Sequence, residues 1–171
     1  MKNVCLIGFM GSGKTSAGRA LAKKLGLRFV DTDLLVQKLS GLTTAAFIKK
    51  RGLTAWRKAE NSAFKAAASA GGKVIALGGG IMPTKDLRPL FRKSGVTVYL
   101  ECCEGGLFKR LAGSLALRPL LGNSPAKAKL AIARLLKQRR PYYEKADLKI
   151  NTCGLTPVQT AGKIAKMLEQ V

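Results

Sequence analysis

Gly8-Phe9-Met10-Gly11-Ser12-Gly13-Lys14-Thr15 decides the fold of this chain, because it fits the pattern G-x-x-x-x-G-K-[ST] at a point where a strand gives way to a helix. The apolar run Val4-Cys5-Leu6-Ile7 precedes it, and a helical pattern from Lys14 to Leu25 follows it. This order of strand, glycine-rich loop and helix is typical of a phosphate-binding loop. The alternative is a glycine-rich turn with a solvated lysine, which the complete strand-loop-helix context disfavours.

The residue types of this loop suit the phosphates of a nucleoside triphosphate. Its glycines let consecutive backbone N–H groups turn toward phosphate oxygens. We expect Lys14 to reach the β- and γ-phosphates and the Thr15 hydroxyl to ligate Mg²⁺, which makes Mg²⁺ the predicted cofactor. The predicted contacts to ATP or GTP from this segment are Gly11, Ser12, Gly13, Lys14, Thr15 and Ser16.

The length and composition of the chain predict one α/β domain covering residues 1–171. With 171 residues, of which 47% are hydrophobic, the chain can bury one substantial core but not two. The first residues, Met1-Lys2-Asn3, lead straight into the first predicted strand, and no apolar run approaches the length of a membrane span. We therefore expect a cytoplasmic protein with no signal peptide and no membrane partner.

The formal net charge of +22 would favour any polyanion, so it does not choose between nucleotides and nucleic acid. The basic residues are spread along the chain, and most of them are expected on solvated helix faces. An alternative from another functional class is a basic module that holds nucleic acid and uses ATP as a switch. The chain lacks a nucleic-acid-binding motif and has few aromatic residues for base stacking, so we expect no nucleic-acid partner.

The four cysteines are interpreted mainly as structural residues. Cys5, Cys102, Cys103 and Cys153 form no C-x-x-C pair, and the chain has no histidine to complete a zinc site. Three of them lie in or beside predicted strands, where a free cysteine behaves as a small apolar residue. The adjacent pair Cys102-Cys103 is the expected exception, because it ends a strand near the predicted site.

Short β-rich apolar runs alternate with amphipathic helical stretches, which is typical of βαβ units and of a parallel sheet covered on both faces. Five parallel strands are predicted, at Asn3–Ile7, Arg28–Val30, Val74–Leu77, Val96–Leu100 and Leu148–Asn151. Helices are predicted at Lys14–Leu25, Asp33–Ser40, Thr43–Lys50, Ala55–Ala70, Lys85–Lys93, Glu104–Ala112, Pro125–Gln138 and Thr156–Glu169. The segment from Gly113 to Ser124 has no clear periodicity and is predicted to be a functional or mobile loop.

Two carboxylates follow the second predicted strand, in Val30-Asp31-Thr32-Asp33. Residues just beyond the carboxyl end of a parallel strand line the ligand crevice, and alternation along the chain predicts that Asp31 and Asp33 share a side. One is expected to hold Mg²⁺, directly or through water, while the other accepts a hydrogen bond from the attacking hydroxyl. The alternative for Asp33, which does not exclude catalysis, is to cap the following helix.

Three glycines, Gly78, Gly79 and Gly80, follow the third predicted strand directly. Three residues without side chains at a strand end predict that a substrate approaches the main chain closely. The alternative is a flexible turn before a helix that starts at Pro83-Thr84, which would need only one or two glycines.

Arginines supply the permanent positive charge that a small anionic substrate and a triphosphate both need. Arg57 could bind a carboxylate while Glu60, three residues further on, holds it in place, although such a pair alone is more typical of a surface ion pair. Arg118 lies in the predicted loop, whose closure could carry its charge onto the transferring phosphate. Arg139 ends a basic helix, and composition alone does not separate it from Arg140.

Six motifs occur in order between about Val4 and Asn151: Gly-x-Met-Gly-x-Gly-Lys-Thr, Asp-Thr-Asp, aromatic-Arg-x-x-Glu, Gly-Gly-Gly, Arg-Pro-Leu-Leu and Arg-x-Pro-x-Tyr. This combination resembles the shikimate kinases. The resemblance implies Mg²⁺-dependent transfer of a phosphoryl group from ATP to the 3-hydroxyl of shikimate, on the way to chorismate and the aromatic amino acids. It implies a three-layer P-loop kinase fold with a five-stranded parallel sheet ordered 2-3-1-4-5. A substrate-binding helical region would cover about residues 33–61 and a lid about 111–124.

The resemblance also implies roles for single residues. Lys14 and Thr15 would serve phosphate and magnesium, and Asp31 would support the metal. Asp33 would bind shikimate hydroxyls and act as, or stand in for, a general base. Arg118 would meet the phosphates from the lid, so the implied catalytic residues are Asp33, Lys14 and Arg118.

The implied substrate contacts are Asp33, Arg57, Gly78, Gly79, Gly80 and Arg139, of which Arg57 and Arg139 would hold the shikimate carboxylate. Glu60 would orient Arg57. Arg110, just before the lid, would lie over the adenine and join Arg118 in binding ATP. We expect ATP and shikimate as ligands of a monomeric enzyme.

The chain departs from the family pattern where shikimate would bind. Leu53 follows Gly52 where a glutamate is usual, Ile48 falls where a phenylalanine commonly packs against the substrate ring, and Trp56 takes a usual Phe position. Ile in place of Phe loses ring-stacking area without losing charge recognition. The alternative within enzymes is another small-molecule kinase of this fold, such as gluconate kinase or an adenylate-kinase-like enzyme, but the arginines and glycines favour a hydroxylated carboxylic acid.

Overall fold

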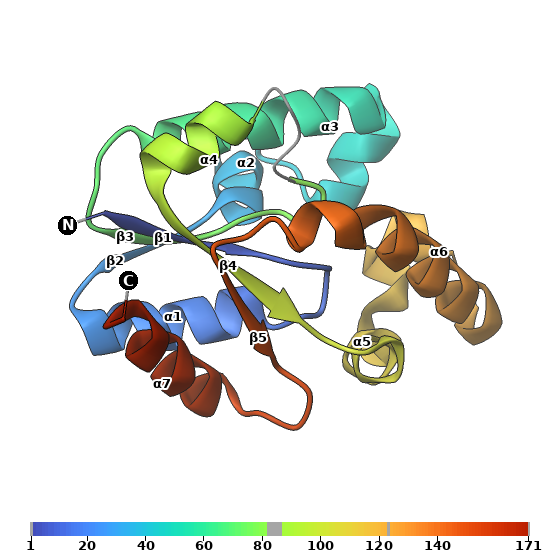
Figure 1. Ribbon diagram of the computed structural model, residues 1–171. Coiled ribbons are helices and arrows are strands. Elements are labelled where there is room, and N and C mark those ends of the chain that lie inside the picture. Colours follow the sequence, from blue (N-terminus) through green and yellow to red (C-terminus); the bar gives the residue numbers. More distant parts are fainter. Residues whose placement is uncertain (1, 82–86, 123, 171) are drawn as a thin grey trace.

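The computed structural model describes residues 2–81, 87–122 and 124–170. Within this part of the chain, five parallel strands form one sheet in the order β2-β3-β1-β4-β5 (Figure 1). They are β1 (Asn3–Ile7), β2 (Arg28–Asp31), β3 (Lys73–Ala76), β4 (Gly95–Glu101) and β5 (Leu148–Asn151). The five predicted strands and their order are confirmed, and every strand end lies within one residue of its predicted position.

Seven α-helices and two 3₁₀ helices lie in the same described residues. The α-helices are α1 (Lys14–Leu25), α2 (Thr32–Ser40), α3 (Thr44–Ala68), α4 (Arg88–Ser94), α5 (Glu104–Leu111), α6 (Pro125–Tyr143) and α7 (Pro157–Leu168). The 3₁₀ helices are η1 (Ala112–Leu117) and η2 (Pro119–Leu121). The predicted helix Lys85–Lys93 corresponds to α4, but its expected start at Pro83-Thr84 lies outside the described residues.

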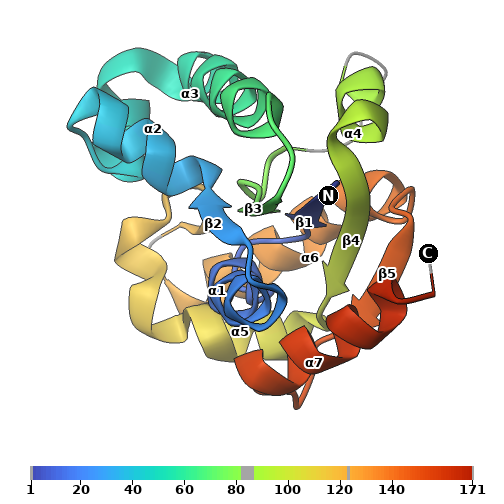
Figure 2. The ribbon, with the colours of Figure 1, turned by 90° about the vertical axis from the view of Figure 1, so that its left-hand side faces the viewer.

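Side chains of the sheet alternate between two apolar layers. In β1, Val4 and Leu6 pack with the buried faces of α1 and α7, while Cys5 and Ile7 pack on the opposite side with residues from α3, α4, α5 and α6. Figures 1 and 2 show α1 and α7 side by side on one face of the sheet. This period-two burial is what a parallel sheet covered on both faces requires.

Gly52 separates two helical segments, as the sequence predicts, although their hydrogen bonds join them as α3. It adopts φ 82° and ψ 162°, a region that favours glycine, and no atom beyond its chain neighbours and the backbone of its own helix lies within 4 Å of a Cβ built there. The kink brings Phe47 against Trp56 with their ring centroids 5.4 Å apart. These aromatics and Val36 of α2 form a small core of their own.

The prediction that the basic helix ends at Gln138 is wrong, because α6 continues through Pro141 to Tyr143. A proline inside a helix costs about 3 kcal/mol, since it removes one hydrogen bond and crowds the preceding turn. Tyr143 is fully buried and stacks on Tyr99 with ring centroids 5.3 Å apart. Packing of the last turn therefore overrides the local preference.

The prediction of an unstructured loop from Gly113 to Ser124 is also wrong in part, because η1 and η2 occupy most of this segment. Leu121 at the end of η2 is fully buried and joins the core beneath α6. Three-residue periodicity is hard to see in short 3₁₀ segments, so the apolar contacts were not apparent from the sequence.

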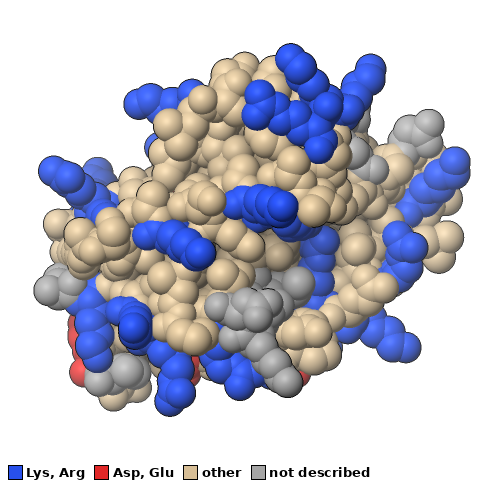
Figure 3. Space-filling view, turned by 90° about the horizontal axis from the view of Figure 1, so that it is seen from above, with Lys and Arg blue, Asp and Glu red and all other residues tan. Residues whose placement is uncertain are grey.

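Basic side chains are scattered over the face seen from the side of α3 and α4, and Figure 3 shows no single dense patch of them. This distribution agrees with the expectation of solvated helix faces. Among the helices that the structure describes, none is long and apolar enough to cross a membrane.

Candidate functional site

Two adjoining cavities lie beside the carboxyl ends of the strands. One, of about 400 Å³, is lined by Arg57, Arg118 and Arg139 together with residues of α2 and α3, and is named here the arginine cavity. The other, of about 430 Å³, is lined by the phosphate loop, Arg110 and Thr152, and is named the loop cavity. Six residues line both cavities: Met10, Thr15, Asp31, Asp33, Gly79 and Arg118. The two cavities therefore meet at a junction that carries two carboxylates and one guanidinium.

The residues predicted to contact ATP come together. All eight of them line the loop cavity: Gly11, Ser12, Gly13, Lys14, Thr15, Ser16, Arg110 and Arg118. Of the six residues predicted to contact the substrate, five line the arginine cavity and one does not. The arginine cavity is lined by Asp33, Arg57, Gly79, Gly80 and Arg139, whereas Gly78 lines neither cavity.

Lys14 is held under the phosphate loop, where only 8% of it is exposed. Its Nζ donates to the carbonyl oxygens of Gly8 and Phe9, both at 2.9 Å. Burial lowers the pKa of Lys14 to about 8, although the charges of Asp33 and Asp31 oppose the shift. The ammonium is thus fixed by the backbone that would surround a phosphate, and it has no carboxylate ion-pair partner among the described residues.

Asp31 links the phosphate loop to α2. Its Oδ2 accepts a hydrogen bond from the Thr15 hydroxyl at 2.7 Å, and its Oδ1 accepts from the backbone N–H groups of Asp33 and Leu34 at 3.0 and 3.2 Å. The helix cap is therefore Asp31, and the alternative that Asp33 caps this helix is wrong. Because α2 already begins at Thr32, Asp33 belongs to a helix. The alternation of side chains along a strand is therefore the wrong explanation for Asp31 and Asp33 lining the same cavities.

Asp33 faces both cavities from the first turn of α2. Among the described residues its buried Oδ1 has no hydrogen-bond partner. Burial raises the pKa of Asp33 to about 7, and the charges of Glu60 and Asp31 add to the shift. A buried carboxyl group of this kind, facing a cavity, is suited to accept a proton or hydrogen bond from a ligand.

The oxygen atoms at the junction also fit a magnesium ion. Thr15 Oγ1 and Asp31 Oδ2 lie 2.7 Å apart and belong to residues that line both cavities. Mg²⁺ prefers oxygen ligands and keeps several waters, so it needs only one or two protein groups beside a phosphate. The unpartnered Asp33 Oδ1 adds a further acceptor nearby.

Arg57 and Glu60 form an ion pair at the floor of the arginine cavity. Glu60 is only 1% exposed, so this is no surface pair, although the arginine side chain keeps 30% of its surface exposed. The carboxylate fixes the guanidinium, whose remaining donors are free to meet an anion in the cavity.

Side chains of the site occupy the space next to Gly78 and Gly80. A Cβ on Gly78 would overlap the carboxylates of Asp33 and Glu60, and a Cβ on Gly80 would overlap the guanidinium of Arg57. The buried Thr32 hydroxyl also accepts a hydrogen bond from the Gly78 N–H at 2.9 Å. The sequence predicts that a substrate approaches the main chain at the three glycines. At residues 78 and 80 the space is instead taken by the side chains of Asp33, Glu60 and Arg57.

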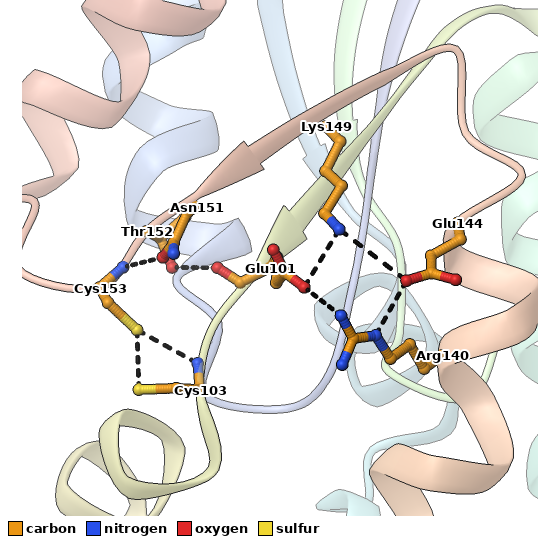
Figure 4. A network of polar contacts seen from close by, with 8 residues as sticks. All are labelled: Glu101, Cys103, Arg140, Glu144, Lys149, Asn151, Thr152 and Cys153. Atoms are coloured by element: carbon orange, nitrogen blue, oxygen red, sulfur yellow. Dashed lines mark hydrogen bonds and ion pairs between the residues drawn. The ribbon is translucent and has the colours of Figure 1, made fainter.

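Arg139 and Arg140 point in different directions from α6. Arg139 is 7% exposed, donates from Nη1 to the Gly79 carbonyl at 2.9 Å and lines the arginine cavity. Arg140, whose side chain is 54% exposed, pairs with Glu101 and Glu144 outside both cavities (Figure 4). The structure thus separates two residues that composition leaves equivalent.

Arg118 lies between η1 and η2, at the junction of the two cavities. Its Nε donates to Ser114 Oγ at 3.5 Å, and no carboxylate of a described residue lies within ion-pair distance. Burial lowers the pKa of Arg118, although the charge of Asp33 opposes this. A half-buried guanidinium without a salt bridge is suited to a strongly anionic ligand.

Arg110 is tied to the back of the phosphate loop. Its guanidinium donates to the Ser12 carbonyl at 3.2 Å and to the Thr152 carbonyl at 2.6 Å. The Thr152 hydroxyl in turn donates to the Ser12 carbonyl at 3.2 Å. Thr152 follows the last strand and carries no motif, so its part in the site was not predicted.

Tyr143 is a second residue whose role the sequence did not reveal. Its hydroxyl donates to the Gly79 carbonyl at 2.5 Å, the same oxygen that accepts from Arg139. The two side chains lie four residues apart on one face of α6, a spacing that could have linked them had the helix been predicted to continue.

Comparison with known proteins agrees with this geometry. The family model described as shikimate kinase matches residues 10–169. The shikimate kinase of Thermodesulfovibrio yellowstonii is 40% identical over 171 residues, which cover 100% of this chain and 97% of that protein.

Solved structures give the same result. The shikimate kinase from Acinetobacter baumannii in complex with shikimate has a TM-score of 0.93 at 30% identity, covering 99% of this chain and 94% of that one. The shikimate kinase from Bacteroides thetaiotaomicron has a TM-score of 0.90 at 28% identity, covering 98% of each chain. Since the family model and the relatives span nearly its whole length, this chain belongs to the shikimate kinase family.

Proposed function

We propose that this chain transfers the γ-phosphate of ATP to the 3-hydroxyl of shikimate, giving shikimate 3-phosphate in chorismate and aromatic amino-acid biosynthesis. The observation that carries the proposal is the junction at which Thr15, Asp31, Asp33 and Arg118 line both cavities. A triphosphate in the loop cavity and an acceptor in the arginine cavity would meet there. Family membership supports the identity of both substrates.

The arginine cavity supports a carboxylic acid as acceptor. Arg57 and Arg139 line it from different helices, and each is held by a further contact, to Glu60 and to the Gly79 carbonyl respectively. Two fixed guanidinium groups can bind a carboxylate with charge-assisted hydrogen bonds. Binding the carboxylate at this end would leave the ring hydroxyls toward Asp33.

Thr15 and Asp31 are the residues that would hold Mg²⁺. When bound, the ion would neutralise charge on the β- and γ-phosphates. Lys14 would add a second positive charge from beneath the loop, and the backbone N–H groups of the loop would fix the phosphates in place.

Asp33 would orient the 3-hydroxyl and receive its proton as the phosphoryl group passes in line. Its raised pKa of about 7 matches this role near neutral pH. In a loose transition state, much of its contribution is to position the acceptor. Arg118 would stabilise the negative charge that develops on the transferring group and would help to exclude water, since hydrolysis competes with transfer.

A coupled ADP-release assay tests the proposed function. Purified protein and Mg-ATP are incubated at moderate salt with shikimate, gluconate, AMP or no acceptor, and the rates of ADP release are compared. We expect ADP release that depends on shikimate. Turnover with another acceptor alone would mean that Ile48 and Leu53, which line the arginine cavity, have changed its specificity. A monomeric state, a cytoplasmic location and a single-domain organisation stay predictions.

A further inference from the structure

Three cysteines come together at the ends of two neighbouring strands. In the parallel pairing of β4 and β5, Glu101 lies opposite Asn151, so Cys103 and Cys153 each follow two residues beyond a paired position. Their sulfur atoms lie 2.9 Å apart, and Cys102 Sγ lies 3.5 Å from Cys153 Sγ. All three sulfur atoms lie within 4.8 Å of one another, and Figure 4 shows Cys103 and Cys153 pointing toward each other.

We propose that Cys102, Cys103 and Cys153 form a binding site for a soft metal ion such as Zn²⁺ or Cu(I). Thiolate sulfur is the donor that such ions prefer, and this cluster offers only sulfur, in a chain without histidine. An ion about 2.3 Å from each sulfur would set the sulfur atoms about 3.8 Å apart. The two measured separations are shorter than this by less than about 1 Å, so small side-chain rotations would suffice.

Gly106 of α5 lies against the three sulfur atoms. A Cβ on Gly106 would lie 2.8 Å from Cys102 Sγ and 3.3 Å from each of the other two sulfur atoms, so the absence of a side chain there keeps the space open. Cys102 is buried, Cys153 is half-buried and Cys103 is exposed. An ion could therefore enter from the side of Cys103, where water could complete its coordination.

The surroundings favour the metal-binding thiolate form of Cys153 and oppose that of Cys102. The backbone N–H of Cys103 donates to Cys153 Sγ at 3.1 Å, and hydrogen bonding with Cys103 lowers the pKa of Cys153. The positive charge of Arg110 acts to lower the pKa of both Cys102 and Cys153. Burial raises the pKa of Cys102 to about 11, so a bound ion would displace the proton of this thiol.

The cluster adjoins the loop cavity through Thr152, which precedes Cys153 and accepts a hydrogen bond from Arg110. An ion held by all three sulfurs would join the segment after β4 to the segment after β5. Binding to the folded state alone raises stability, so Zn²⁺ should raise the thermal unfolding temperature of the protein.

The test titrates the full chain, reduced with a phosphine that does not bind metals, with Co²⁺ and then with Zn²⁺. Thiolate-to-cobalt charge-transfer absorption reports sulfur ligation directly. We expect one Co²⁺ per chain, displacement by Zn²⁺, and a higher unfolding temperature with Zn²⁺. The variants Cys103→Ser and Cys153→Ser should weaken Zn²⁺ binding by roughly tenfold or more, since even outer contacts of a metal site are worth that much. The matched control Cys5→Ala removes the buried thiol outside the cluster and should bind as the wild type does.

Absence of the charge-transfer band in the folded, reduced wild-type protein would overturn the proposal. So would a Co²⁺ affinity of Cys103→Ser equal to that of the wild-type protein, since the exposed position of this residue allows the variant to fold. If the wild-type protein, in a buffer of reduced and oxidised glutathione with excess Zn²⁺, instead lost two hydrogen atoms to the oxidised glutathione and lost metal uptake, Cys103 and Cys153 would be a disulfide-forming pair and no metal site.

Discussion

The guanidinium of Arg57 lies against the backbone of Gly80, in the space that any side chain at residue 80 would occupy. Glu60 holds the same guanidinium from within α3. The orientation of Arg57 therefore depends on Glu60 of its own helix, α3, and on Gly80 in the segment that follows β3. This arrangement makes Gly80 a positioning residue for the arginine cavity.

Gly80→Ala is expected to displace Arg57 and to raise the KM for shikimate by roughly 10-fold to 100-fold, because one charged hydrogen bond is worth about 1.5–3 kcal/mol. Turnover at saturating shikimate and the KM for ATP should change little. Steady-state kinetics checks this, with Gly162→Ala in α7 as the control, since no atom beyond its chain neighbours and the backbone of its own helix lies within 4 Å of the added Cβ there. An unchanged KM for shikimate would remove Arg57 from the carboxylate site.

Asp33→Asn is expected to lower kcat by about 100-fold or more, because the side chain can no longer receive the proton or orient the hydroxyl as an anion. ATP affinity should stay within a few-fold, since Lys14 and the loop remain in place. Single-turnover kinetics and nucleotide titration separate the two effects. Turnover that survives within a few-fold would end the catalytic assignment of Asp33.

The same carboxyl group should make stability depend on pH in the absence of ligands. Burial and neighbouring charges raise the pKa of Asp33 from 3.8 to about 7. Between these values the unfolded chain releases the proton while the folded chain retains it, so the free energy of unfolding falls as pH rises. Relative to wild type, Asp33→Asn should gain about 4 kcal/mol between pH 4 and pH 8. Urea unfolding in EDTA measures this difference, and parallel pH curves for the two proteins would contradict it.

Arg118→Ala is expected to lower kcat by about 100-fold to 1,000-fold, because a charge aimed at the transferring group is lost. Shikimate affinity should be nearly unchanged and can be followed by the fluorescence of Trp56, the single tryptophan, which lines the arginine cavity. Arg140→Ala removes an exposed arginine outside both cavities and serves as the control. Weakened shikimate binding with normal turnover would remove Arg118 from the proposed transfer role.

Ile48→Phe is expected to lower the KM for shikimate by a few-fold, since an aromatic ring adds contact area worth about 0.5–1.5 kcal/mol. Ile48 lines the arginine cavity and packs beside the core formed by Phe47 and Trp56. Leu39→Phe, at a position that is 77% exposed on α2, controls for the added ring. A higher KM would show that the cavity is already filled and that a larger side chain overpacks it.

Local patterns were enough to predict the five parallel strands and the phosphate loop, whereas the strand order was implied by the resemblance to the shikimate kinases. Apolar runs of four or five residues, glycine-rich turns and helical periodicity are all read over short distances, and a covered parallel sheet leaves few ways to connect them. Most of the motif residues line the two cavities, although Gly78 lines neither of them. Periodicity failed where tertiary packing opposed it, as when the burial of Tyr143 carried α6 through Pro141.

The sequence by itself determined that this chain builds a P-loop kinase fold and which residue types reach the ends of its strands. Only the tertiary structure decided that Arg139 faces the arginine cavity while Arg140 faces outward, because each residue turns a helix by about 100° and the packing of α6 sets its rotation. It also decided that Asp31 rather than Asp33 caps α2 and that Cys102, Cys103 and Cys153 form one cluster. Contacts between segments that lie about 50 residues apart have no signature in local spacing, since strand register and helix packing create them.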